Sequence, residues 1–349
     1  MPHRHNQIEI NELDDKAKKG VKTRILVALP LIAVAAIALV FGSWAIFAIL
    51  AICLGFSVYE IMRSPGKRFN FWTWIATYVF GFGLAFWPLL KSNVAAFIES
   101  VSGGPAYHFM LEEAFAQPII PITLVGLMVI VYFLMGILDR DLSFRDISYL
   151  FLLTLIVGFA YQSLLFCRYY PSVSFFEDTT YGWQGHYGSD LLALPHFRFG
   201  WGSALLVTVV LVSALTDTFA FFGGLLFGKH KMNPRVSPKK TWEGFFFGIG
   251  GGTLVALSVM FALAASGYPL LPELDMAHWY RMLILGILLP FFATIGDFAF
   301  SLIKRGEGIK DFGVAFPGHG GFLDRLDSHL ISALGTATIL AFFMHGWLF

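Results

Sequence analysis

The feature that most constrains this chain is a series of nine apolar stretches, each close to the length that a helix needs to cross a bilayer. A transmembrane helix takes about 20 apolar residues, and only helices and closed barrels satisfy their backbone hydrogen bonds in lipid. The stretches are 25–42, 45–62, 70–90, 118–138, 147–166, 201–228, 244–266, 281–303 and 328–348. The sequence therefore predicts an all-α polytopic membrane protein with about nine transmembrane helices.

The composition excludes an ordinary soluble protein. Of the 349 residues, 57% are hydrophobic and 13% are charged, against about a quarter charged in soluble domains. The two cysteines, Cys53 and Cys167, are too few for a disulfide framework or a zinc site. Nothing in the charge pattern indicates a nucleic-acid partner.

Three regions are expected along the chain. A charged cytoplasmic tail covers 1–24, and no small-residue cleavage pattern follows the first apolar stretch, so that stretch is interpreted as a retained span. Transmembrane helices with outer-side insertions cover 25–200, and a C-terminal transmembrane region that we expect to be catalytic covers 201–349.

Lysine and arginine predict the orientation. Of the 24 such residues, 20 lie in the tail and in alternate loops, and only Lys91, Arg168, Arg198 and Arg281 lie between them on the other side. By the positive-inside rule, the N-terminus is cytoplasmic and the C-terminus is outside. The segments expected to face the cytoplasm are 1–24, 63–69, 139–146, 229–243 and 304–327.

Three carboxylates fall within or at the edges of the expected spans. A charge near the bilayer centre costs about 2.5–3.5 kcal/mol, so each needs a partner, a cavity or an interfacial position. Glu60 is expected to pair with Arg63, three residues further on, with a functional role as the alternative. Asp217 and Asp297 are expected to line a water-filled cavity open to the cytoplasm, or else to pair with basic residues of neighbouring helices.

The loop 304–327 combines acidic, basic and glycine residues. If Asp324 and Asp327 begin the last helix, their spacing places both on one face, where they repel unless protonated or bridged by a cation. Such oxygen ligands suit Mg²⁺; the alternative is two solvated acids at a helix N-terminus. The preceding "PGHGG" is a turn of the kind that cradles phosphate, with basic clamps beside it. These residues are Gly318, His319, Gly320, Gly321, Lys304, Arg305 and Lys310, and His319 is open to either a phosphate-binding or a structural role.

The loop 229–243 supplies a second basic cluster on the same side. A loop that merely contacts anionic lipid would explain its charge but not its "SPKKTWE" turn. Ser237, Lys239, Lys240 and Thr241 suit a triphosphate or a lipid phosphate, and Trp242 and Glu243 are expected to support the loop.

The spacing of these residues resembles the signature of the phosphatidate cytidylyltransferases. The resemblance rests on Ser301-x-x-Lys304-Arg305, Lys310-Asp311, Pro317-Gly318-His319-Gly320-Gly321 and Asp324-Arg325-Leu326-Asp327. The stretch "DTFAFFGGLLFGKHKMNPRVSPKKTWEG" is similar to a second block of that family, and "KTRILVALPLIA" to the usual start of its first span. The resemblance is close over 201–330 and only in outline before it.

The resemblance implies a membrane enzyme that uses Mg²⁺ to convert CTP and phosphatidate into CDP-diacylglycerol and pyrophosphate. It implies that Asp297, Asp324 and Asp327 hold the metal. The other expected catalytic residues are Lys304, Arg305, Lys310, Asp311 and His319, and the expected substrate-binding residues are Asp217, Ser237, Lys239, Lys240, Thr241, Ser301, Gly318, Gly320, Gly321 and Arg325. Phe300 and Phe312 depart from the family pattern, where a glutamate and a small hydroxyl residue are common.

The expected partners are CTP, phosphatidate and membrane lipid, in a bacterial inner membrane with the site facing the cytoplasm. A homodimer and a second cation are left open. Two rival functions remain: a CTP-dependent polyprenol or lipid kinase with a similar site, and an ion-coupled transporter with Asp217 and Asp297 as coupling residues.

Overall fold

The computed structural model describes residues 43–87, 122–173, 201–267, 269–313 and 320–345. These residues fall into two compact units. The first contains Val207–Lys310 and Asp327–Gly335, and the second contains the described parts of Ala38–Leu206, Asp311–Leu326 and Thr336–Phe349. The last helix, Leu323–His345, contributes residues to both units.

The described residues form eight α-helices and almost no strand. Six helices are long and apolar enough to cross a membrane, and α3 and α6 are shorter apolar helices. This confirms a helical membrane protein, while the first expected span, 25–42, lies outside the described residues; nine spans and their orientation stay predictions. The helices are α2 (Ser43–Arg63), α3 (Phe71–Ala85), α6 (Ile122–Leu138), α7 (Phe144–Val173), α8 (Trp201–Phe227), α9 (Trp242–Ala265), α10 (Trp279–Gly306) and α11 (Leu323–His345).

In the first unit, α8 and α9 approach closely because both carry small residues spaced four apart. A Cβ built on Gly248 would lie 2.7 Å from the Ala220 Cβ and 3.0 Å from the Thr216 carbonyl oxygen, so only glycine fits there. Small residues at such spacing are the usual means by which membrane helices pack. The α9 residues are Gly244, Gly248 and Gly252, and those of α8 are Thr216, Ala220 and Gly224.

A second close approach brings α10 against the first turns of α11. A Cβ on Gly296 would lie 2.7 Å from the carbonyl oxygen of Asp327 and 2.9 Å from the Ile331 Cβ. The absence of a side chain at Gly296 thus sets how near α10 comes to α11 at the residue before Asp297.

A β-hairpin connects α8 to α9 in the loop that carries the second basic cluster. Strand β1 (Lys231–Asn233) pairs antiparallel with β2 (Ser237–Thr241), with Lys231 opposite Thr241. The Glu243 carboxylate accepts from the backbone N–H groups of Lys229 (3.1 Å) and His230 (3.2 Å) and pairs with the His230 ring. The expectation that Glu243 supports this loop is confirmed, and the hairpin is a small departure from an all-α fold.

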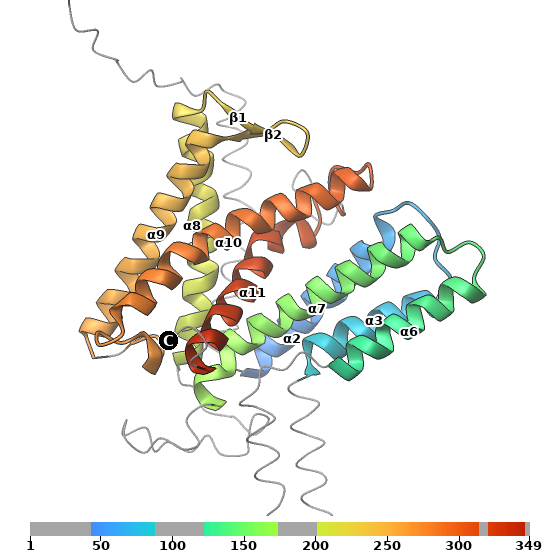
Figure 1. Cartoon of the computed structure of the whole chain (residues 1–349), viewed down its shortest axis with the longest axis horizontal. Coiled ribbons are helices and arrows are strands. Elements are labelled where there is room, and N and C mark those ends of the chain that lie inside the picture. The colour runs from blue at the N-terminus through green and yellow to red at the C-terminus, as the bar shows by residue number, and fades with distance from the viewer. Residues whose placement is uncertain (1–42, 88–121, 174–200, 268, 314–319, 346–349) are drawn as a thin grey trace, which may run out of the picture. The chain divides into compact units, whose positions relative to one another are not determined.

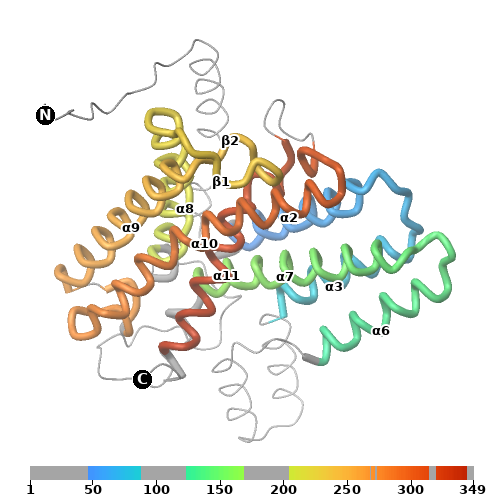
Figure 2. Tube along the Cα trace, turned by 45° about the horizontal axis from the view of Figure 1, so that its top comes forward, coloured from blue at the N-terminus to red at the C-terminus, as the bar shows by residue number. Residues whose placement is uncertain are grey.

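In the second unit, α2, α3, α6 and α7 run side by side (Figures 1 and 2). Buried hydroxyl groups link these helices. Tyr132 on α6 donates to Thr77 on α3 at 3.0 Å, and Tyr161 on α7 lies 3.0 Å from the Ser57 hydroxyl on α2. The bundle is therefore tied together by hydrogen bonds as well as by apolar packing.

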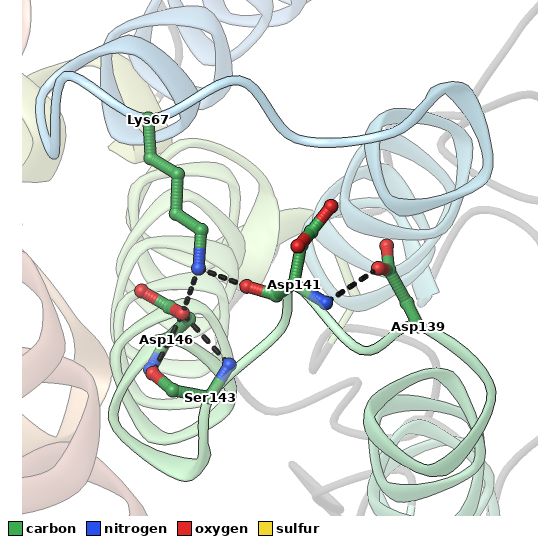
Figure 3. Close-up of polar contacts among 5 residues, drawn as sticks. All are labelled: Lys67, Asp139, Asp141, Ser143 and Asp146. Carbon is green, nitrogen blue, oxygen red and sulfur yellow. Dashed lines mark hydrogen bonds and ion pairs between the residues drawn. The ribbon is translucent and has the colours of Figure 1, made fainter.

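Two loops that are both expected to face the cytoplasm meet at one end of this bundle (Figure 3). Lys67, between α2 and α3, forms a 2.6 Å ion pair with Asp146 and donates to the carbonyl oxygen of Asp141, between α6 and α7. Asp139 accepts from the Asp141 N–H at 3.0 Å within the same loop. The two loops thus lie on the same side of the second unit, as the expected topology requires.

Candidate active site

Three carboxylates from three helices of the first unit lie close together. Asp217 on α8 accepts a 2.7 Å hydrogen bond from the Ser328 hydroxyl of α11, and Asp327 accepts from the Ser328 backbone N–H at 2.8 Å. Asp297 on α10 is near enough for its negative charge to act on both other carboxylates. The structure therefore brings together carboxylates that are far apart in the sequence, with 110 positions between Asp217 and Asp327.

Lys240 reaches this carboxylate cluster from the hairpin. Its ammonium nitrogen lies 2.6 Å from an Asp297 carboxylate oxygen and 3.8 Å from the centre of the Phe298 ring. Lys304 is buried, and its positive charge is near enough to interact with the Asp327 carboxylate. Three carboxylates and two lysine side chains are thus gathered in the first unit.

Asp297 was expected either in an open cavity or paired with a neighbouring helix. Its partner is a lysine, but that lysine comes from a β-hairpin rather than from a helix. The Ser301 hydroxyl, one turn further along α10, lies 3.5 Å from the other Asp297 oxygen. Two expected substrate-binding residues therefore lie directly at an expected metal ligand.

Arg305 joins the two basic loops of the first unit. It donates to the Val236 carbonyl oxygen at 3.3 Å and to the Ile309 carbonyl oxygen at 2.9 Å, which holds the hairpin at the end of α10. Thr241 is buried and its hydroxyl caps α9 by accepting from the Gly244 N–H at 3.2 Å. Lys239 is exposed on the hairpin.

In the second unit, Asp324 organises the loop before α11. One of its carboxylate oxygens accepts from the backbone N–H groups of Phe312 (2.8 Å) and Gly321 (2.9 Å). Gly320 has a φ of +83°, which favours glycine at that position. Since α11 begins at Leu323, five residues before the expected span, Asp324 and Asp327 do lie in the first turns of a helix, three residues apart.

The expected partner of Glu60 is wrong. Its buried carboxylate accepts from the backbone N–H groups of Phe322 and Leu323, each at 2.8 Å, whereas the Arg63 guanidinium lies over the Tyr59 ring. A residue three positions away was the only partner that the sequence could suggest, because the actual partners follow 262 and 263 residues later.

The remaining expected residues are less informative. Gly318 and His319 lie outside the described residues, and Lys310, Asp311 and Arg325 are exposed. Ser328 was missed, although it directly follows the "DRLD" motif. Phe300 and Phe312, the two departures from the family pattern, are buried core side chains.

The carboxylates of the first unit are chemically suited to a divalent cation such as Mg²⁺. Among the described residues, no three acidic, histidine or cysteine side chains form a ready-made metal-binding group. Magnesium, however, is usually held by one or two carboxylates together with water and substrate phosphates. Asp297 and Asp327 supply oxygens of that kind within one unit.

Comparison with known proteins places this chain in a family. The model of the cytidylyltransferase family matches residues 22–343, so the chain belongs to that family. Among curated proteins, it is 36% identical over 150 residues to the phosphatidate cytidylyltransferase of Mycobacterium bovis, which is 43% of this chain and 44% of that protein. It is also 41% identical over 129 residues (37% and 46%) to that of Staphylococcus epidermidis, and 38% over 134 residues (38% and 32%) to the chloroplastic phosphatidate cytidylyltransferase 4 of Arabidopsis thaliana. The matches thus span less than half of each relative.

Proposed function

We propose that this protein transfers the cytidylyl group of CTP to phosphatidate, which yields CDP-diacylglycerol and pyrophosphate. The observation that carries the proposal is the convergence of Asp217, Asp297 and Asp327 with Lys240 and Lys304 in a chain of the cytidylyltransferase family. The names of the similar curated proteins support the same reaction.

The proposed reaction is one in-line displacement. An oxygen of the phosphatidate phosphate forms a bond to the α-phosphorus of CTP, and the bond from that phosphorus to the bridging oxygen of the β-phosphate breaks. The electron pair leaves with pyrophosphate. A phosphate monoester is already largely ionised near neutral pH, so the step needs positioning and charge stabilisation more than a general base.

The residues of the first unit have separate tasks in this proposal. Lys304 and Arg305 donate to phosphate oxygens at the end of α10, as charged donors do best. Lys240 leaves Asp297 for the nucleotide, because a phosphate offers the same ammonium group a partner of greater charge. The hairpin thereby carries a phosphate-binding residue to the carboxylates.

The predicted metal ligands remain Asp297, Asp324 and Asp327. When bound, Mg²⁺ would neutralise charge on the phosphates and on the departing pyrophosphate. The nearness of Asp297 and Asp327 within the first unit supports two of these ligands. Asp324 is supported by its place three residues before Asp327 on α11.

The proposed setting is a bacterial inner membrane, with nine spans and the site open to the cytoplasm. CTP is a soluble nucleotide, whereas phosphatidate keeps its acyl chains in the bilayer. Carboxylates near the ends of apolar helices lie where a soluble and a lipid substrate can meet.

Labelled CTP tests the proposal. Purified protein in mixed micelles would be incubated with phosphatidate, Mg²⁺ and CTP labelled either at the α-phosphate or at the γ-phosphate. We expect the α-label in the lipid fraction and the γ-label in pyrophosphate. Label from the γ-phosphate in lipid would instead indicate a lipid kinase, and no transfer of either label would contradict both reactions. Reactions with ATP, GTP and UTP serve as controls for the base.

A further inference from the structure

Glu60 is a buried carboxylate that none of the proposed chemical steps uses. It lies in the last turn of α2 with 4% of its surface exposed. Its two oxygens accept separately, one from the Phe322 N–H and the other from the Leu323 N–H, both at 2.8 Å. Burial of a carboxylate is costly unless it is well hydrogen-bonded, so this arrangement indicates a specific task.

The task is to hold the first turn of α11. The first four N–H groups of a helix have no partner within the helix, and a negative charge is favourable there. Glu60 takes the N–H groups of Phe322 and Leu323, while Asp324 takes those of Gly321 and Phe312. Two carboxylates, one from within α11 and one from α2, therefore bind the N–H groups of Phe312 and of residues 321–323.

The surroundings leave Glu60 little freedom. A Cβ placed on Gly313 or on Gly321 would collide with the Glu60 carboxyl group, so two backbone segments press against it. One turn earlier on α2, Phe56 stacks on Phe322, with ring centroids 4.7 Å apart and planes 7° from parallel. The α2 helix thus contacts the turn before α11 through Phe56 and Glu60, which lie one helical turn apart on the same face.

We propose that Glu60 is a positioning residue that acts through Asp324. By fixing the N–H groups of Phe322 and Leu323, it sets the direction in which α11 starts and hence where Asp324 is presented. This inference rests on the proposed function, in which Asp324 is a metal ligand. No contact between Glu60 and substrate is involved.

The key variant is Glu60→Gln, which keeps the size of the side chain. An amide has one acceptor oxygen, and its NH₂ group would face an N–H donor, so one of the two contacts is lost. We expect kcat to fall by about 10- to 100-fold, the usual effect of a small misplacement of catalytic groups. The Mg²⁺ concentration for half-maximal activity should rise severalfold, because Asp324 is less well placed.

The matched control is Ser57→Ala on the same helix. The Ser57 hydroxyl is buried and bonds Tyr161 of α7, but it does not contact the turn before α11. Its loss should lower thermal stability in detergent and leave the Mg²⁺ dependence unchanged. A merely structural role for Glu60 would make both variants behave alike, with lower stability and an unchanged Mg²⁺ requirement.

Hydrogen exchange gives a readout that does not depend on activity. In Glu60→Gln, the amides of residues 321–324 should exchange at least about tenfold faster than in the unaltered protein, while those of α7 keep their rates. Unchanged exchange at 321–324 would overturn the positioning role. If the unaltered protein has no activity but its amides at 321–324 still exchange more slowly than those of Glu60→Gln, the result would count against the proposed function alone.

Discussion

Lys240 and Lys239 are neighbours on β2 with opposite surroundings. Successive side chains of a strand point to opposite faces; Lys240 is 2.6 Å from Asp297, whereas Lys239 is exposed. Both were predicted from the sequence as substrate-binding residues, and the sequence could not distinguish their roles because both are lysines in the same loop. The hairpin that separates them depends on Glu243, thirteen residues after His230.

Replacing each lysine by methionine tests this difference. Lys240→Met removes a charged donor from the carboxylate cluster, and we expect kcat/KM for CTP to fall about 100-fold. Lys239→Met removes an exposed charge and should cost about fivefold or less. Steady-state kinetics with phosphatidate in mixed micelles would measure both. Equal losses would contradict the separate roles of the two lysines.

Partners distant in sequence set the limit of prediction at this scale. Asp217 and Asp297 could be singled out because a carboxylate within an apolar span needs a partner or a cavity, and Asp327 because of its spacing from Asp324. The hydrogen bond from Ser328 to Asp217, and the one from Phe322 to Glu60, join residues that are more than a hundred positions apart. Without those contacts, only a local partner such as Arg63 was available for Glu60.

At the scale of whole elements, apolar length predicted where helices lie better than where they end. The expected span 70–90 extends past the end of α3 at Ala85, and the expected span 328–348 begins five residues after α11 does, at Leu323. A count of apolar residues leaves out polar residues such as Asp324 and Asp327, although both lie in the first turns of that helix.

Asp297 on α10 and Asp327 on α11 lie where these two helices cross. The missing side chain of Gly296 allows the helices to come close together there. Gly296→Ala would force a Cβ into the Asp327 carbonyl oxygen, so the helices must separate. We expect a loss of stability of about 1–3 kcal/mol, as for other overpacked sites, together with reduced activity because Asp297 moves away from Asp327. Thermal unfolding in detergent and cytidylyl transfer would be measured on the same sample.

Gly250→Ala is the control for that change. Gly250 lies on an exposed face of α9, and a Cβ there would meet no atom within 4 Å. Since alanine is favoured over glycine in helices by up to about 1 kcal/mol, this variant should be as stable as the unaltered protein or more so, with full activity. A similar loss in both variants would mean that close packing at Gly296 is not the cause.

At the scale of the whole molecule, loops expected on one side of the membrane meet within each unit. In the first unit, Arg305 from the segment 304–327 binds the 229–243 hairpin. In the second unit, Lys67 links the loops 63–69 and 139–146. Charge counts along the sequence assigned all four segments to the cytoplasm, and the contacts agree in each unit taken by itself, because segments in contact must lie on the same side.

Labelling of single cysteines tests whether both units have the expected orientation. In a background in which Cys53 and Cys167 are alanine, one cysteine would be introduced by Arg140→Cys, Asn233→Cys or Met276→Cys, all at exposed positions. A maleimide that does not cross membranes should label Met276→Cys in intact cells, because the segment between α9 and α10 is expected outside. Arg140→Cys in the second unit and Asn233→Cys in the first should react only after the membrane is opened. Labelling of either one in intact cells would reverse the orientation of its unit, and would place the phosphate-binding hairpin or the Lys67 loop on the side that CTP does not reach.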